Sequence, residues 1–367
     1  MSPNIQENVS LKDLTTMHVG GPARFFIEAK NIEDLRSAID WAKEKTLSVF
    51  ILGGGSNLVI SDAGFPGLVI QVKIKYWEVL HEDDDKVFLK IGAGENWDEV
   101  VARVVRHGWW GLENLSLIYG TLGGIIVQNA GAYGAEISSV VNRVEIYDRE
   151  ISEVKEFFKD DCHFGYRSSL FQKTERYLIL SAVLELKKTG TSNINYPDVA
   201  KYFAEKNIIE PNLSDIRQAI ATIRQYKLPD PEVLGSAGSF FKNLLLTTEE
   251  YQKLKEKISA NFNSDTVTNL EEIKNKFPMA EAIKIPTAWI LDICGLKGES
   301  AGQAFIYEKQ PLIIINKNNS ATADDIMNLV KKVRQTVFAK TGIELELEPE
   351  LVGFSQKELL GYLKIKN

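Results

Sequence analysis

The chain has few cysteines and no cluster of basic residues. Its 367 residues include only two cysteines, Cys162 and Cys294, which lie far apart and have no metal-ligand partner at a usual spacing. We therefore expect no metal site, and we interpret both as reduced thiols in the core or near a site. The formal net charge is −7. Because nucleic-acid binding depends on clustered Lys and Arg, this composition argues against a nucleic-acid partner.

Long hydrophobic runs are absent as well. No stretch approaches the length of a membrane span, and the polar start, MSPNIQENVSLKDLTT, lacks the apolar core of a signal peptide. We therefore expect a cytoplasmic protein with no membrane partner. Hydrophobic residues make up 44% and charged residues 25% of the chain, as in ordinary soluble proteins. A chain of this length exceeds the size at which one core keeps growing, so we expect two or three domains.

Glycine, in contrast, is concentrated in one stretch, GLENLSLIYGTLGGIIVQNAGAYGAE, at 111–136. Only Glu113 and Glu136 are charged in it. Glycine loses more backbone freedom on folding than other residues, so such density marks turns with positive φ or a close approach of backbone to a ligand. Successive backbone N–H groups can hold a pyrophosphate without a basic side chain. The alternative is a tight glycine-rich turn that binds nothing.

A second glycine loop follows a strand expected at 48–52, in the sequence ILGGGSNL. A strand that ends in a glycine loop suggests a dinucleotide site. The loop lacks the GxGxxG spacing, however, and the residues after it, 58–60, look like another strand and not a helix. The sequence therefore does not support a Rossmann fold.

Hydrophobic periodicity predicts the other elements. Strands are expected at 25–29, 58–60, 68–72, 76–80, 87–91, 141–147, 153–157, 177–186, 305–307, 312–315 and 343–347. Helices are expected after an Asn31 cap, at 95–107, after Pro197, at 213–226 from a Ser214 cap, at 247–261, at 288–294 and at 322–340 up to Gly342. A polar linker is expected at 187–195. This mixture of elements predicts an α+β chain.

Arg167 is a lone permanent charge in the aromatic, glycine-containing segment FGYRSS. It either binds an anion or stacks on an aromatic ring. The neighbouring His163 we interpret as structural.

Nine segments, in order along nearly the whole chain, resemble those of one family, the UDP-N-acetylenolpyruvoylglucosamine reductases, also called UDP-N-acetylmuramate dehydrogenases. They are TMHVGGPA, ILGGGSNL, GAGENW, GLENLSLIYGTLGG, QNAGAYGAE, FGYRSSLF, KLPDPEVLGSAGSFFKN, the Gln310 region before LIIIN, and LEPEL. Tyr196, in INYPD, looks like the loop tyrosine of the longer family type. The chain departs from the family in having Gly54 where an acidic residue is frequent and Leu244 where a proline is frequent.

The resemblance implies an α+β flavoprotein with FAD as cofactor. Its FAD-binding part would have the vanillyl-alcohol-oxidase-type (PCMH-like) fold, with subdomains at 1–72 and 73–227, the latter completed by 343–367. A smaller substrate-binding domain would occupy 228–342. The cofactor-binding residues implied are Gly53, Gly54, Gly55, Ser56, Asn57, Gly120, Thr121, Gly123, Gly124, Asn129, Gly131, Ala132 and Tyr133.

The resemblance also implies the reaction, an NADPH-dependent reduction of UDP-N-acetylenolpyruvoylglucosamine in cytoplasmic peptidoglycan precursor synthesis. Arg167 matches the residue that stabilises the negative charge formed during reduction, and Ser239 matches the proton donor to C2 of the enolpyruvyl group. Glu350 matches a further residue near the substrate carboxylate, with no settled role. The implied substrate-binding residues are Tyr166, Tyr196, Lys227, Asn243 and Gln310. We expect a monomer.

Two alternatives to this function assign the chain to other functional classes. A non-enzymatic flavin or nucleotide sensor would keep the glycine cradle but would not need Arg167, Ser239 and Glu350 together. A flavin oxidase of the same fold, acting on a small alcohol, would not need the domain at 228–342.

Overall fold

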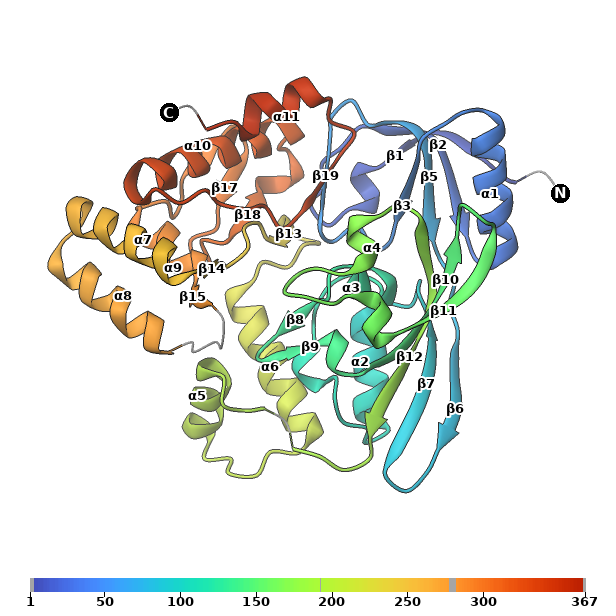
Figure 1. Cartoon of the computed structure of the whole chain (residues 1–367), viewed down its shortest axis with the longest axis horizontal. Coiled ribbons are helices and arrows are strands. Elements are labelled where there is room, and N and C mark those ends of the chain that lie inside the picture. Colours follow the sequence, from blue (N-terminus) through green and yellow to red (C-terminus); the bar gives the residue numbers. More distant parts are fainter. Residues whose placement is uncertain (1–2, 192, 277–281, 366–367) are drawn as a thin grey trace. The chain divides into compact units, whose positions relative to one another are not determined.

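The computed structural model describes residues 3–191, 193–276 and 282–365 (Figure 1). The expected linker at 187–195 thus includes one residue, 192, that lies outside the described part. The chain forms two compact units that interleave along the sequence. The first comprises Met1–Val9, Ala23–Gly55 and Pro66–Tyr226, and the second comprises Ser10–Pro22, Ser56–Phe65 and Lys227–Asn367.

Two β-sheets and a short ladder build the described part of the first unit. The strands that lie wholly or mostly in it are β1 (Gln6–Ser10), β2 (Pro22–Ala29), β3 (Val49–Leu52), β5 (Phe65–Val72), β6 (Trp77–Glu82), β7 (Lys86–Gly92), β8 (Gly131–Ala132), β9 (Ala135–Glu136), β10 (Val141–Asp148), β11 (Glu153–Phe158) and β12 (Tyr177–Lys187). One sheet has the order β1-β2-β5-β3, with β3 parallel to β5. The other is antiparallel, in the order β11-β10-β12-β7-β6.

Several helices lie in the described part of the first unit, and only some of them begin at a side-chain cap. They are α1 (Ile32–Glu44), α2 (Trp97–Arg106), η2 (Glu113–Leu115), α3 (Leu122–Val127), η3 (Ile137–Ser139), η4 (Lys159–Cys162), α4 (Leu170–Lys173), α5 (Pro197–Lys206) and α6 (Leu213–Lys227). The predicted cap of α1 is confirmed, since the Asn31 side chain accepts a hydrogen bond from the N–H of Asp34 at 2.8 Å.

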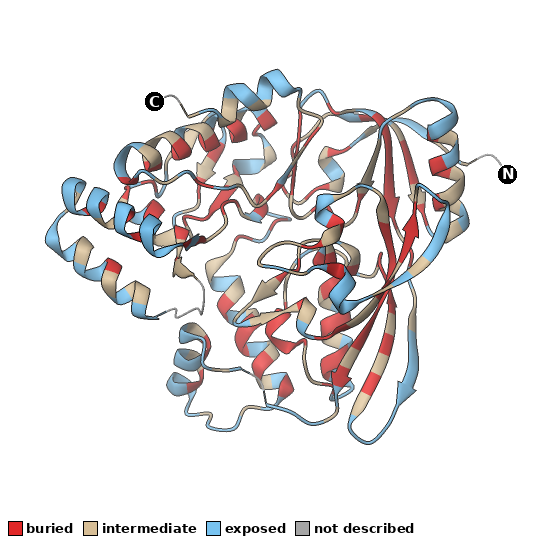
Figure 2. Ribbon diagram, in the orientation of Figure 1, coloured by how far each residue is buried: buried red, intermediate tan, exposed pale blue. Residues whose placement is uncertain are grey.

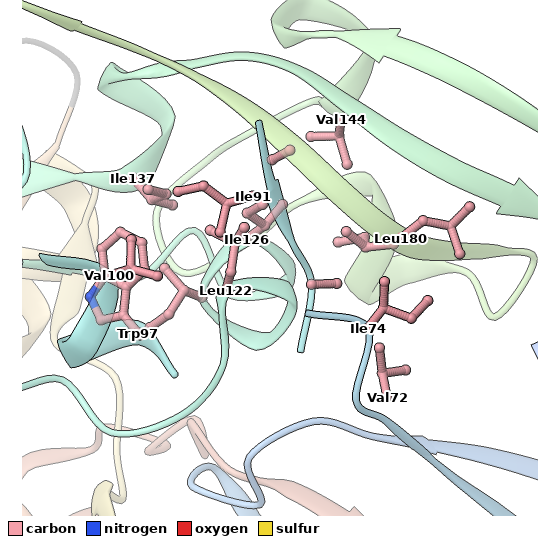
Figure 3. Close-up of a cluster of buried hydrophobic side chains, with 14 of the residues drawn as sticks. Val72, Ile74, Ile91, Trp97, Val100, Leu122, Ile126, Ile137, Val144 and Leu180 are labelled. Atoms are coloured by element: carbon pink, nitrogen blue, oxygen red, sulfur yellow. The ribbon is translucent and has the colours of Figure 1, made fainter. Parts of the chain in front are cut away.

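One face of the antiparallel sheet forms the core of the first unit against α2 and α3 (Figure 3). Ile91 of β7 and Leu180 of β12 lie in the same buried cluster as Trp97 of α2 and Ile126 of α3. The buried indole of Trp97 donates from Nε1 to the carbonyl of Leu115 at 3.0 Å. The core thereby fixes the chain within the first part of the glycine-rich stretch.

The opposite face of the same sheet is polar, as the alternation of side chains along a strand requires. Lys90 Nζ lies 2.6 Å from Glu145 Oε2, and Ser181 Oγ donates to that oxygen at 2.8 Å. The edge strand β6 is exposed along most of its length (Figure 2). An antiparallel sheet can therefore face water on this side while its other side holds the core.

The second unit combines short strands with three longer helices. Its elements are η1 (Lys12–Leu14), β4 (Leu58–Ile60), β13 (Gly235–Ser239), β14 (Leu244–Leu246), α7 (Thr248–Asn261), α8 (Ser264–Lys276), β15 (Ile283–Ile285), α9 (Thr287–Ile293), β16 (Ser300–Ala301), β17 (Ala304–Ile306), β18 (Ile313–Asn316), η5 (Lys317–Asn319), α10 (Ala323–Thr341), β19 (Glu350–Val352) and α11 (Gln356–Leu363). The strands pair as β13-β18-β17-β16, β14-β15 and β19-β4.

Helix α10 is the centre of this unit's hydrophobic cluster. Its predicted ends are confirmed: Thr322 caps it by accepting from the N–H of Asp325 at 3.0 Å, and Gly342, at φ 73°, ends it. The carboxylate of Asp62 accepts the N–H groups of Ala323 and Asp324 at 2.9 and 3.1 Å. This second capping group explains why residues from early in the sequence belong to the second unit.

One predicted cap and one predicted strand are wrong. Helix α6 begins at Leu213 as predicted, but the side chain of Asn212, and not that of Ser214, accepts the N–H groups of Ser214 and Asp215. No strand forms at 343–347, where the described chain pairs only at Leu347, with Phe241. The last strand is instead β19, which lies parallel to β4.

The boundary between the units falls between Tyr226 and Lys227, one residue before the predicted start of a substrate domain at 228. Residues 343–367 cluster with the second unit. The assignment of domains at 1–72, 73–227 and 228–342 stays a prediction.

Candidate active site

The two glycine loops touch through their backbones. A Cβ added to Gly54 would lie 2.7 Å from the Cα of Gly120, and one added to Gly53 would lie 2.9 Å from Oγ1 of Thr121. No side chain therefore fits at either position unless the 120–121 segment moves. This explains why the chain tolerates glycine at 54, where the resembling family frequently has an acidic residue.

A buried acceptor without a partner lies beside this contact. Gln71 of β5 is 5% exposed, its Nε2 lies 3.5 Å from the carbonyl of Gly53, and its Oε1 has no hydrogen-bond partner among the described residues. An unsatisfied buried polar atom costs about 1–3 kcal/mol. Backbone without side chains, next to the buried Oε1 of Gln71, fits a bound group that carries hydroxyl and N–H donors, as FAD does.

Strained backbone is concentrated in the glycine-rich stretch. Leu117, Asn129 and Tyr133 have φ values of 58°, 43° and 48°, a left-handed region that residues other than glycine rarely adopt. Such residues cost on the order of 1–3 kcal/mol each and are concentrated at functional sites. Their presence favours a ligand-binding role for this stretch over a simple turn.

Asn129 holds two loops together. Its Nδ2 donates to the carbonyl of Gly165 at 2.9 Å and to Oε2 of Glu136 at 3.1 Å, while its Oδ1 accepts from the N–H of Ser138 at 3.2 Å. With its amide engaged in this way, Asn129 positions the turn that carries Arg167. Direct cofactor contact by its side chain stays a prediction.

Arg167 occupies a tight turn in which Gly165 and Ser168 exchange backbone hydrogen bonds of 2.9 and 3.1 Å. Its guanidinium donates from NH2 to the carbonyl of Gly131 at 2.7 Å and lies over the Tyr166 ring, 5.4 Å from the ring centroid. A Cβ on Gly131 would approach NH1 of Arg167 to 3.2 Å. The structure thus combines the stacking alternative with a fixed position beside the glycine-rich stretch.

Tyr133 joins the predicted cofactor site to the segment that carries Tyr196. The two rings meet edge to face, with centroids 5.2 Å apart. Burial raises the pKa of both phenols, so both hydroxyls stay protonated at neutral pH. Tyr133 also contacts Arg224 of α6, whose Nε donates to the carbonyl of Leu117 at 3.1 Å. Burial lowers the pKa of the Arg224 guanidinium.

The second unit places Ser239 and Glu350 on segments that pair with each other. The backbone of Phe240, next to Ser239, accepts the N–H of Glu348 at 3.0 Å, two residues before Glu350. The N–H of Glu350 donates to the carbonyl of Asn57 at 3.0 Å, and Asn57 Nδ2 donates to the carbonyl of Glu348 at 3.0 Å. Ser239 is half-buried and Glu350 is exposed.

Three further predicted substrate residues lie in the second unit. Asn243 Oδ1 accepts the N–H of Thr287 at the start of α9, at 3.1 Å. Gln310 precedes β18, and its Oε1 lies 3.5 Å from the N–H of Leu312. Lys227 is the last residue of α6 and is half-buried.

The predicted site residues therefore divide between the units. The first unit holds Gly53 to Gly55, Gly120 to Tyr133, Tyr166, Arg167 and Tyr196. The second holds Ser56, Asn57, Lys227, Ser239, Asn243, Gln310 and Glu350.

The cysteines do not provide a nucleophile. Burial raises the pKa of Cys162 to about 12 and that of Cys294 to about 11, so both are neutral thiols near pH 7. No group of His, Cys, Asp and Glu among the described residues is arranged to hold a metal ion. None of the helices in the described chain is long and apolar enough to cross a membrane.

Sequence reasoning missed Gln71, Asn114 and Arg224. Gln71 interrupts the apolar run GLVIQV, which is a usable signal for a buried polar group. Asn114 and Arg224 have no such signal, because their roles depend on partners 19 or more positions away.

Comparison with known proteins identifies the family of the chain. Residues 23–154 match a family described as an FAD binding domain, and residues 230–352 match the C-terminal domain of UDP-N-acetylenolpyruvoylglucosamine reductase. The UDP-N-acetylenolpyruvoylglucosamine reductase of Flavobacterium johnsoniae is 36% identical over 351 residues, which cover 95% of this chain and 99% of that protein. That of Bdellovibrio bacteriovorus is 37% identical over 347 residues, 94% and 98% of the two chains.

A solved structure of this reductase from Thermus caldophilus has a TM-score of 0.64 and 24% identity, covering 95% of this chain and 99% of that one. This likeness and the FAD-binding match confirm the predicted α+β flavoprotein fold. Given the identity to its relatives over nearly its whole length, the chain belongs to the UDP-N-acetylenolpyruvoylglucosamine reductase family.

Proposed function

We propose that the protein reduces UDP-N-acetylenolpyruvoylglucosamine to UDP-N-acetylmuramate with NADPH, in peptidoglycan precursor synthesis, and that FAD is its cofactor. The observation that carries the proposal is the position of Arg167, a fixed guanidinium bonded to the Gly131 carbonyl of the glycine-rich stretch. When bound, FAD supplies hydride transfer from NADPH to C3 of the enolpyruvyl group.

The glycine loops are proposed to hold the cofactor. Side chains at 53 or 54 would collide with the 120–121 segment, so glycine at both positions lets the two loops pack together through their backbones. Backbone N–H groups suit a pyrophosphate because they donate hydrogen bonds from fixed positions without a flexible cationic side chain. Gln71 offers an acceptor for one of the cofactor's hydroxyl or N–H groups.

Arg167 is proposed to stabilise the charge that reduction creates. Hydride addition at C3 places negative charge at C2 and on the adjacent carboxylate. A guanidinium held in place by Gly131 needs little reorganisation to interact with that charge. Its planar fork can also grip a carboxylate with two hydrogen bonds.

Ser239 is proposed to donate the proton that completes the product at C2. A serine hydroxyl is a weak acid, but the carbanion-like centre that it meets is a strong base. Glu350, on the segment paired with that of Ser239, is proposed to act near the substrate carboxylate, where it must be protonated or paired with a cation. Tyr166, Tyr196, Lys227, Asn243 and Gln310 are proposed to bind the sugar nucleotide, with Lys227 as a point charge for its diphosphate.

Flavin absorbance tests the proposal directly. The purified protein should be yellow, NADPH should bleach it without oxygen, and UDP-N-acetylenolpyruvoylglucosamine should restore the colour. A flavin oxidase would instead be bleached by a small alcohol and reoxidised rapidly by oxygen. A sensor would bind FAD but would not restore its colour with the sugar nucleotide.

Location and assembly are part of the same proposal. Both substrates are charged nucleotides that do not cross a membrane, which supports a cytoplasmic reaction. The monomeric state stays a prediction that size-exclusion chromatography with light scattering would test.

A further inference from the structure

Residues 193–196 lie against the glycine-rich stretch at several points. Asn114 Nδ2 donates to the carbonyl of Asn193 at 2.9 Å. Gly134 approaches the side chain of Asn193 so closely that an added Cβ would lie 2.7 Å from its Nδ2. The Tyr196 ring meets the edge or face of Tyr133, with centroids 5.2 Å apart. These contacts bring the segment that opens α5 onto the predicted cofactor site.

The Asn114 side chain bonds both to the Tyr196 segment and to the glycine-rich stretch. Its Nδ2 also donates to the carbonyl of Tyr133, again at 2.9 Å. The side chain is 3% exposed, and its Oδ1 is buried without a hydrogen-bond partner among the described residues. Turning the amide over would direct that oxygen at two carbonyl oxygens, so the orientation is fixed by chemistry.

The two hydrogen bonds of Asn114 constrain the backbone segments that carry the Tyr133 and Tyr196 rings. One fixes the peptide of Tyr133, whose backbone has a strained φ of 48°. The other fixes Asn193, three residues before Tyr196. Because one amide bonds to both, Asn114 links the backbone of Tyr133 to the segment that carries Tyr196.

We propose that Asn114 is a positioning residue for substrate binding, which holds the Tyr196 segment against the glycine-rich stretch through the carbonyls of Tyr133 and Asn193. Without its two bonds, the segment would leave the docked arrangement more often. Binding of the sugar nucleotide would then have to order this segment, and the free-energy cost of that ordering would weaken its affinity. Reduction of the flavin by NADPH does not need Tyr196, so it should be unaffected. The part concerning the sugar nucleotide rests on the proposed function.

The test uses Asn114→Asp, which keeps the shape but places oxygen opposite both carbonyls, and Asn114→Ala, which removes the donors without adding charge. Hydrogen exchange of peptides covering residues 193–206 reports whether the segment is held. Anaerobic bleaching by NADPH and the KM for UDP-N-acetylenolpyruvoylglucosamine report the two half-reactions. The matched control is Asn275→Asp, an exposed position on α8 of the second unit.

Both Asn114 variants should accelerate exchange in 193–206 and raise that KM by about tenfold, the scale of one lost buried hydrogen bond. FAD content and the bleaching rate should stay within about twofold of the wild type, and Asn275→Asp should match the wild type throughout. Unchanged exchange in both variants would overturn the proposal. So would faster exchange with an unaltered KM, or a loss of bleaching in parallel with the KM change. If the wild type does not reduce the sugar nucleotide, the proposed function fails, and exchange alone still decides whether Asn114 holds the segment.

Discussion

Arg167 carries its charge on a backbone conformation that arginine rarely adopts, with φ at 49°. The turn that imposes it is secured by Asn129, which donates to the carbonyl of Gly165. The position of this guanidinium therefore depends on the strained backbone of Arg167 itself, on the buried amide of Asn129 and on the absence of a side chain at Gly131. This amount of local support is typical of a group that must be ready before the substrate binds.

Arg167→Lys keeps the charge but loses the planar fork and the bond from NH2 to Gly131. We expect sugar reduction to slow by about two orders of magnitude or more, the scale of losing one preorganised donor. FAD should be retained. Single-turnover oxidation of the reduced flavin by the sugar nucleotide measures the effect.

Arg143→Lys is the matched control, because Arg143 pairs with the half-exposed Glu156 on β11. It should behave as the wild type. Normal turnover of Arg167→Lys would remove Arg167 from the mechanism.

At the scale of elements, the start of α5 places Tyr196 at the edge of the glycine-rich stretch, 36% exposed. If this segment closes over bound sugar nucleotide, Tyr196 excludes water and contacts the ligand. Tyr196→Ala should then weaken binding of the sugar nucleotide by about tenfold, as for other buried aromatic contacts. NADPH oxidation by a simple electron acceptor should change much less.

Steady-state kinetics with both acceptors measures the two effects. Tyr202→Ala, in helix α5 and packed edge to face against Phe203, is the control for a loss of helix stability. Equal losses in both reactions would indicate a folding defect and exclude a specific role for Tyr196.

The hairpin of β10 and β11 depends on another buried charge. Arg176 donates to both oxygens of Asp148, at 2.8 Å each, and the Asp148 side chain is 1% exposed. The Arg176 guanidinium, chiefly, holds the pKa of that carboxyl well below its usual range. A depressed folded-state pKa adds stability that is complete above the unfolded value, about 3.9, and is lost as pH falls through the folded value.

Arg176→Gln should therefore lower the free energy of unfolding by about 3 kcal/mol at pH 7, since it removes both guanidinium bonds and leaves Lys155, at 3.3 Å, to pair with the buried carboxylate. The difference from the wild type should shrink below about pH 4. Arg143→Gln, which breaks a half-exposed pair, should cost less than about 1 kcal/mol. Urea unfolding at constant FAD concentration measures both, and a pH-independent difference would contradict the charge argument.

Element ends show what the sequence can and cannot predict. Asn31, Thr322 and Gly342 act within one turn of their own positions, so their roles are readable from local spacing. The strand expected at 343–347 fails because pairing depends on Phe241, which is remote in sequence. The same limit applies to the site. The density of glycine predicted the loops, but Asn114 and Gln71 bond to backbone carbonyls 18 or more positions away, which the local sequence does not indicate.

At the scale of the whole molecule, the proposed reduction of the sugar draws on residues of both units. The glycine-rich stretch and Arg167 belong to the first unit, and Ser239 belongs to the second. Reduction of the flavin by NADPH requires no proton at the sugar. A change at Ser239 should therefore separate the half-reactions, whereas a general loss of fold would impair both.

Ser239→Ala should still be bleached by NADPH at nearly the normal rate, while reoxidation by UDP-N-acetylenolpyruvoylglucosamine should slow by about 10²–10⁴-fold, the usual contribution of a positioned general acid. Ser239→Cys should recover part of that loss, because a thiol is the stronger acid and fits nearly the same space. Ser239 also ends β13 after Gly238, at φ 72°, so it could serve only to shape a turn. In that case both half-reactions would fall together or neither would. Stopped-flow flavin absorbance, recorded separately with each substrate, decides between the two roles, and parallel changes would exclude Ser239 as the proton donor.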